Sequence, residues 1–211
     1  MKWRTLARIA LAFFSIAFLA SIFSPIFHRG PPPGSRSICQ SNLKQVALGI
    51  AQYLQDYDGR YPSVYVNAVA TSVAPFNTPY GWADGLQPYL KSVRIFKCPA
   101  MEDHDDVADG VGNNFTDYYL NTDLNRASEK SLAMPASSIL LGEGNGGGDL
   151  TDARYNRNSL PLSWLHDKAM PSFRHMAGAN YAFADGHVKW LQPDKIIAAR
   201  PAFEGVTFAL R

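Results

Sequence analysis

The sequence lacks the short motifs that mark most catalytic domains. It contains neither the Gly-x-Ser-x-Gly turn of a serine hydrolase nor the His-Glu-x-x-His pair of a zinc peptidase. The glycine-rich stretch from Gly142 to Gly148 lacks the Gly-Lys-Ser/Thr sequence that a phosphate-binding loop requires, so we interpret it as a flexible loop. These absences favour a protein without enzymatic activity.

A strong excess of charge is also absent. The formal net charge at pH 7 is +2, and the basic residues are scattered along the chain instead of gathering on one element. Proteins that bind nucleic acid usually carry a basic stripe or a characteristic motif, and neither is present. We therefore expect no nucleic-acid partner.

One long apolar run lies near the N-terminus. Ile9 to Phe27 carries no charged residue and is nineteen residues long, which as a helix would span about 28 Å at roughly 1.5 Å per residue. Basic residues precede it, a distribution that keeps an N-terminus in the cytoplasm. We predict a single-pass inner-membrane anchor over residues 1–29, followed by an extracytoplasmic, periplasmic domain. A cleaved signal peptide is the alternative, with the same destination for the domain.

Cysteine is scarce, with two residues in 211. Neither Cys39 nor Cys98 belongs to a Cys-x-x-Cys unit of the kind that binds metal. In an exported domain, two cysteines can form a disulfide or remain as two buried thiols. The sequence by itself leaves both alternatives open.

Beyond the apolar run, the spacing of apolar residues predicts an α+β domain. Residues 30–37 are rich in proline and glycine and are interpreted as a linker to a domain over 38–211. From Ile38 to Tyr57 apolar residues recur every three or four positions, which predicts an amphipathic helix. Ser138 to Leu141 is short enough and apolar enough for a strand, and Val93 to Pro99 is interpreted as a brief strand or an extended segment. We expect the helix to pack on one face of a small antiparallel sheet.

The stretch from His175 to Leu191 combines a hairpin pattern with chemically reactive side chains. Apolar residues alternate on both sides of Asp185-Gly186, a dipeptide that favours a tight primed turn because it tolerates positive φ angles. We predict strands from Tyr181 to Ala184 and from His187 to Leu191. His175, ten positions before Asp185, is interpreted as a hydrogen-bonding residue that braces this hairpin.

The same residues allow a second interpretation, in which the domain binds a metal. His175, Asp185 and His187, with Glu143, would supply imidazole and carboxylate ligands suited to zinc at the centre of a metal-dependent hydrolytic domain. An acidic run from Glu102 to Asp109 offers oxygen ligands for calcium, although it lacks the pattern of a twelve-residue calcium loop. Because hairpin chemistry accounts for Asp185, we predict no resident cofactor, with zinc and calcium as the alternatives.

Four blocks of the chain follow one another in a distinctive order. They are Cys39 to Ile50 with its exit at Tyr57 to Pro62, Trp82 to Leu90 with Phe96 to Pro99, Ser137 to Glu143, and His175 to Leu191. In this order the blocks resemble the bacterial prepilin-like family named for its motif of a histidine, nine residues and Asp-Gly. The resemblance covers nearly the whole of the expected domain, and His175, Asp185 and Gly186 are the residues of its motif.

The resemblance implies a pseudopilin-type α+β fold, an N-terminal helical anchor and an association with type II secretion or pilus-like assemblies. It implies no established enzymatic activity. The usual prepilin cleavage site is missing, since Gly30 is the first glycine of the chain and lies beyond the apolar run. We therefore expect a membrane-anchored structural or interaction protein of the cell envelope, with other envelope or pseudopilin-like proteins as partners.

Overall fold

The computed structural model describes most of the chain from Gly34 onward and a few residues before it. The described residues are 34–64, 81–101, 115–146, 149–197 and 205–210, together with Trp3, Arg8, Leu11 and Phe13–Ser15. Gly34–Arg211 forms one compact unit, separate from Met1–Pro33. The fold and the site described below belong to the larger unit.

The prediction of a transmembrane helix is corrected. Among the residues that the structure describes, no helix is both long enough and apolar enough to cross a membrane. Most of Ile9 to Phe27 lies outside the described residues. Apolar composition was the basis of the prediction, and composition shows that a segment could enter lipid without showing that it forms a continuous helix. The inner-membrane location and the anchoring, which depended on that helix, are withdrawn with it.

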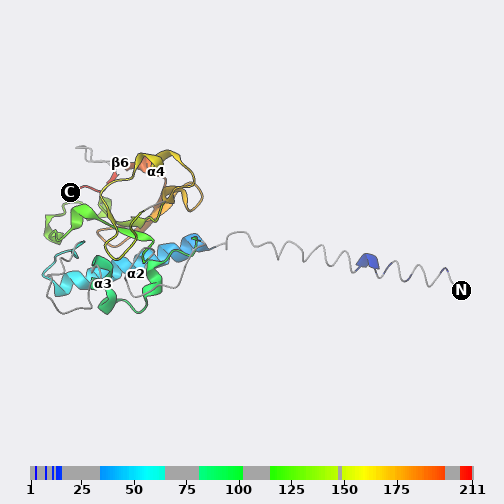
Figure 1. Ribbon diagram of the computed structural model, residues 1–211, viewed down its shortest axis with the longest axis horizontal. Coiled ribbons are helices and arrows are strands. Elements are labelled where there is room, and N and C mark those ends of the chain that lie inside the picture. Colours follow the sequence, from blue (N-terminus) through cyan, green and yellow to red (C-terminus); the bar gives the residue numbers. More distant parts are fainter. Residues whose placement is uncertain are drawn as a thin grey trace. The chain divides into compact units, whose positions relative to one another are not determined.

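The larger unit is an α+β fold in which one long helix and a group of short elements pack on opposite faces of a five-stranded sheet (Figure 1). The strand order is β3-β1-β2-β4-β5, and a separate two-stranded sheet joins β6 to β7. The strands are β1 (Tyr118–Asn121), β2 (Ile139–Glu143), β3 (Asn156–Arg157), β4 (Ala179–Phe183), β5 (Val188–Leu191), β6 (Ile196–Ile197) and β7 (Val206–Thr207). The α-helices are α2 (Ser35–Asp56), α3 (Trp82–Gly85) and α4 (Leu162–His166). The 3-10 helices are η2 (Gln87–Tyr89), η3 (Val93–Phe96), η4 (Thr122–Leu124), η5 (Glu129–Ser131), η6 (Pro135–Ser137), η7 (Pro171–Phe173) and η8 (Pro193–Lys195).

Helix α2 confirms the predicted amphipathic helix. Leu43, Val46, Ile50 and Leu54 are all buried, at the three- and four-residue steps that place them on one side of a helix. The helix begins at Ser35, within the range 30–37 that was expected to be a linker. It ends where two consecutive residues, Asp58 and Gly59, take positive φ angles of 54° and 69°.

The sheet is mixed, whereas the sequence predicted an antiparallel one. Strand β1 pairs with β2 antiparallel but with β3 parallel. Strand β2 also pairs antiparallel with β4, so it lies inside the sheet and both of its faces are covered. On β4, Ala182 packs in the cluster with α2, and Tyr181 and Phe183 pack in the cluster with α4. The alternation of residues on β4 therefore separates two apolar cores.

The hairpin is present, but its turn differs from the predicted primed turn. Strands β4 and β5 pair from Ala179 with Leu191 to Ala182 with Val188. The Gly186 N–H donates to the Phe183 carbonyl at 2.8 Å, and Gly186 has a φ of 84° while Asp185 keeps a negative φ. This is a type I turn followed by a glycine bulge, which needs a single left-handed residue.

We expect Gly186→Ala to lower the free energy of unfolding by about 1 kcal/mol, because an alanine resists the left-handed conformation. An added Cβ would meet no atom closer than Lys44 Nζ at 3.9 Å, so the cost is one of backbone conformation alone. Equilibrium unfolding in urea measures the change. Asparagine, which tolerates this conformation better, should lose less at the same position. An alanine variant as stable as the wild type would contradict the assigned turn.

Candidate functional site

A buried disulfide forms the centre of the candidate site. Cys39, in the second turn of α2, is bonded to Cys98, which follows η3, across 59 positions of sequence. Both residues have no exposed surface. The segment before Cys98 was predicted to be a strand and is the 3-10 helix η3, whose start is capped by the Ser92 hydroxyl accepting from Arg94 N at 3.2 Å. The disulfide therefore fastens the loop after η3 to the helix.

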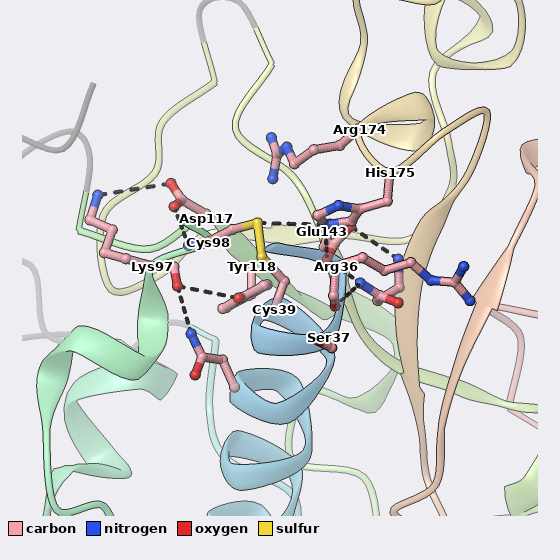
Figure 2. The surroundings of a disulfide bond; sticks show 12 residues. Arg36, Ser37, Cys39, Lys97, Cys98, Asp117, Tyr118, Glu143, Arg174 and His175 are labelled. Atoms are coloured by element: carbon pink, nitrogen blue, oxygen red, sulfur yellow. Dashed lines mark hydrogen bonds and ion pairs between the residues drawn. A yellow bond between two sulfur atoms is a disulfide. The ribbon is translucent and has the colours of Figure 1, made fainter. Parts of the chain in front are cut away.

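A hydrogen-bonded couple, Glu143 and His175, lies beside the disulfide in the interior (Figure 2). His175 Nε2 is 3.0 Å from Glu143 Oε1, and the two side chains are essentially unexposed. Asn180 donates to both carboxylate oxygens, from its backbone N–H to Oε2 at 3.0 Å and from Nδ2 to Oε1 at 2.8 Å. Burying a carboxylate is costly unless it is hydrogen-bonded, and these three contacts meet that requirement.

The backbone around His175 holds its ring in place. The His175 N–H donates to the Gly178 carbonyl at 2.8 Å, and the Trp190 indole N–H donates to the His175 carbonyl at 2.9 Å. The next two residues, Met176 and Ala177, have φ angles of 57° and 70°, which non-glycine residues rarely adopt. Such backbone conformations persist where surrounding contacts impose them. The tight loop thereby directs the ring inward towards β2.

The disulfide and the Glu143–His175 couple are in contact. Cys98 Sγ is 3.7 Å from His175 Nε2. One donor atom from each of Cys39, Cys98, Glu143 and His175 falls in a group whose members all lie within 4.8 Å of one another. All four residues are buried, so a substrate from solvent does not reach them in this conformation.

Charged groups surround this cluster. Asp117 accepts from Cys98 N at 2.7 Å and lies 3.8 Å from Lys97 Nζ. Burial lowers the pKa of Lys97, and the carboxylate of Asp117 opposes that shift. Burial, with the nearby charge of Glu143, raises the pKa of Tyr118 and of Tyr181 well above the usual range. Both phenols therefore stay protonated under ordinary conditions.

Asp185 and His187 lie elsewhere, at the hairpin turn. His187 Nδ1 is 2.6 Å from Asp185 Oδ1, and the two side chains are about two-fifths exposed. Burial tends to raise the pKa of Asp185, but the hydrogen bonds from the His187 backbone and ring outweigh it and lower that pKa. The His187 ring stacks on Phe183 with centroids 4.2 Å apart. This exposed pair does not join the buried donor group.

The four predicted metal ligands thus divide into two pairs. Glu143 and His175 are together in the core, and Asp185 and His187 are together at the surface. The calcium candidate from Glu102 to Asp109 lies outside the described residues. Comparison with protein family models, with curated proteins and with solved structures finds no match to this chain. The resemblance to the prepilin-like family therefore stays a prediction from the sequence.

Two polar residues of the site were not anticipated from the sequence. Asn180 occupies a buried position in a strand of otherwise apolar and aromatic residues, and Asp117 is buried next to β1. A lone asparagine between alanine and tyrosine in a predicted buried strand is a detectable signal, because buried amides are kept where they satisfy another polar group. The sequence does not mark Asp117 in the same way, because the polar residue Thr116 precedes it and an aspartate there is ordinary.

Proposed function

We propose that the protein is a pseudopilin-like structural and interaction domain, in which the stretch from His175 to Gly186 is a clamp and not a catalytic site. The observation that supports this is the position of the two ends of the stretch. At one end His175 binds Glu143 on β2, and at the other the Gly186 carbonyl accepts from Lys44 Nζ on α2 at 2.6 Å. The clamp thus ties the hairpin to both the neighbouring strand and the long helix.

The chemistry of the buried end agrees with this role. General acid–base catalysis requires a group within hydrogen-bonding reach of a substrate. The atom of His175 nearest to Glu143 is engaged there, and both oxygens of Glu143 already accept hydrogen bonds from Asn180. These groups are satisfied by the fold itself, as expected for structural residues.

An interaction surface is supported by the outer side of α2. Between Ser37 and Gln55 the helix contains a single charged residue, Lys44, although exposed helix faces are usually rich in charge. Leu48, in the middle of this stretch, is 49% exposed. A helix face with one charge and an apolar centre suits contact with a helix of another protein. We propose that the partner is a helix-first α+β protein, meaning one in which a long helix precedes the strands of the sheet, as it does in this chain.

Site-specific photo-crosslinking in the producing cells tests this interaction. A photoreactive amino acid at Leu48 of the full chain should give one discrete crosslinked product, which mass spectrometry identifies as a helix-first α+β protein. Leu162 on α4, which is 77% exposed, serves as the matched control and should give no such product. Equal products from both positions, or none from Leu48, would contradict the proposal.

A further inference from the structure

We propose that reduction of the Cys39–Cys98 disulfide creates a zinc site, formed by the two cysteine thiolates, the His175 imidazole and the Glu143 carboxylate. The proposal concerns the reduced protein and goes beyond the clamp, which is a property of the fold with the disulfide formed. Thiolate, imidazole and carboxylate are the groups that bind zinc in proteins, and four protein ligands are typical of a closed structural site.

The geometry of the oxidised protein already brings the ligand atoms together. The four donor atoms lie within 4.8 Å of one another. In a tetrahedral zinc site with bond lengths of about 2.0–2.3 Å, ligand atoms are about 3.3–3.8 Å apart. Cleavage of the S–S bond allows the two sulfur atoms to move apart towards that spacing, while His175 Nε2 is already 3.7 Å from Cys98 Sγ.

The ligands come from four segments that the fold holds independently. Cys39 is on α2, Cys98 follows η3, Glu143 ends β2, and His175 lies in the tight loop before β4. This spacing along the chain differs from the short Cys-x-x-Cys pattern, and the sequence pointed to Glu143 and His175 without joining them to the cysteines. A site assembled by packing is available only to the folded chain.

Neighbouring groups are arranged to orient two of the ligands. Asn180 holds the Glu143 carboxylate by two hydrogen bonds. Gly178 and Trp190 fix the backbone of His175. Such partners outside the ligand set typically change metal affinity about 10–100-fold when removed. His175 Nε2 lies against Cys98 Sγ and Glu143 Oε1, so Nε2 is the nitrogen that would bind the cation.

The charges of the reduced cluster also favour a cation. Two thiolates and a carboxylate carry three negative charges, which a buried site does not hold without compensation. Zn²⁺ neutralises two of them. The Arg174 guanidinium, which donates to the Gly144 carbonyl next to Glu143, is a further positive group in the surroundings of the disulfide (Figure 2).

The conversion is balanced with a dithiol as the reductant. The dithiol supplies two electrons and two protons, the S–S bond between Cys39 and Cys98 breaks, two protein thiols form, and the dithiol becomes a cyclic disulfide. Binding of Zn²⁺ then releases the two thiol protons to solvent as the Zn–S bonds form. Reoxidation reverses both steps and releases the metal.

Cobalt(II), which replaces zinc in tetrahedral thiolate sites and is coloured there, is the probe for this site. The full chain is reduced with dithiothreitol, freed of it by anaerobic desalting, and titrated with Co²⁺. We expect one Co²⁺ per chain, with sulfur-to-cobalt charge-transfer absorption and visible bands of a tetrahedral ion. The oxidised chain should show none of these bands, and Zn²⁺ should displace the cobalt from the reduced chain.

Single substitutions at the proposed ligands test which side chains bind the metal. His175→Ala and Glu143→Gln should each weaken Co²⁺ binding to the reduced chain by about 100-fold or more, since removal of an outer partner alone costs about 10–100-fold. His187→Ala, at the exposed pair, should bind as the wild type does. Circular dichroism of each reduced protein, with and without the metal, reports its fold. The proposal is overturned if the reduced wild type takes up no Co²⁺, folded or not, or if oxidised and reduced chains bind alike.

Discussion

Replacing both cysteines with serine should lower the free energy of unfolding by about 4 kcal/mol in the metal-free protein. The disulfide closes a loop of 59 positions, and removing it returns that loop's conformational freedom to the unfolded chain. The Cys39→Ser/Cys98→Ser variant and the oxidised wild type are compared by equilibrium unfolding in urea, with a chelator present. The midpoint of the variant should move to lower urea concentration with little change in slope.

The reduced wild type is the matched control for this variant. Its metal-free form lacks the same loop closure but keeps both sulfur atoms, so it separates the effect of the crosslink from that of the serine hydroxyls. We expect the reduced wild type to lie close to the double variant. A loss below about 1 kcal/mol in both would show that the disulfide does not limit stability.

Glu143→Ala should cost about 3 kcal/mol of unfolding free energy, because several buried donors lose their acceptor and each such loss costs about 1–3 kcal/mol. The change removes the acceptor that His175 Nε2 and the Asn180 backbone N–H face, and it leaves Asn180 Nδ2 with only the longer hydrogen bond to the Arg36 carbonyl at 3.3 Å. Glu143→Gln keeps the shape and one acceptor oxygen, so its loss should be smaller. Thermal and urea unfolding of the oxidised proteins measure both variants.

Asp185→Asn provides the comparison for Glu143. Asp185 also pairs with a histidine at short range, but that pair is exposed at the turn. Exposed ion pairs contribute about 1 kcal/mol or less, so Asp185→Asn should stay within that range. If Asp185→Asn and Glu143→Ala cost the same, burial would not be what distinguishes the two couples, and the clamp would need another explanation.

The elements that the sequence predicted well are those determined by local patterns. Helix α2 follows from apolar residues at helical spacing, and its buried side carries Leu43, Val46, Ile50 and Leu54 as expected. Strand β2 was predicted from the short apolar run that ends at Leu141 and follows a proline-containing turn, although the strand continues through Gly142 to Glu143. The α+β class follows from these elements together.

The parts that could not be predicted depend on contacts between distant residues. Strand β3 has two residues and joins β1 in parallel, and no pattern of that length specifies a partner or a direction. Glu143 and His175 are 32 positions apart, so their pairing needed the register of β2 with β4. The loop that turns His175 inward uses Met176 and Ala177 in left-handed conformations, where the sequence suggests neither.

The connection between α2 and the C-terminal hairpin has a consequence for how the chain reaches its fold. Three hydrogen bonds join them, from Gln40 to Val188, from Lys44 to Gly186 and from Asn180 to Arg36, across separations of 142 to 148 positions. Contacts this distant in sequence slow folding, because long loops must close before any stabilising contact forms. During synthesis α2 and the η2 and η3 segments that pack on it are made well before β4 and β5, which cover the rest of its apolar side. The part of the helix that β4 covers therefore stays exposed until the hairpin has been made, and this is the interval in which a chaperone would bind it.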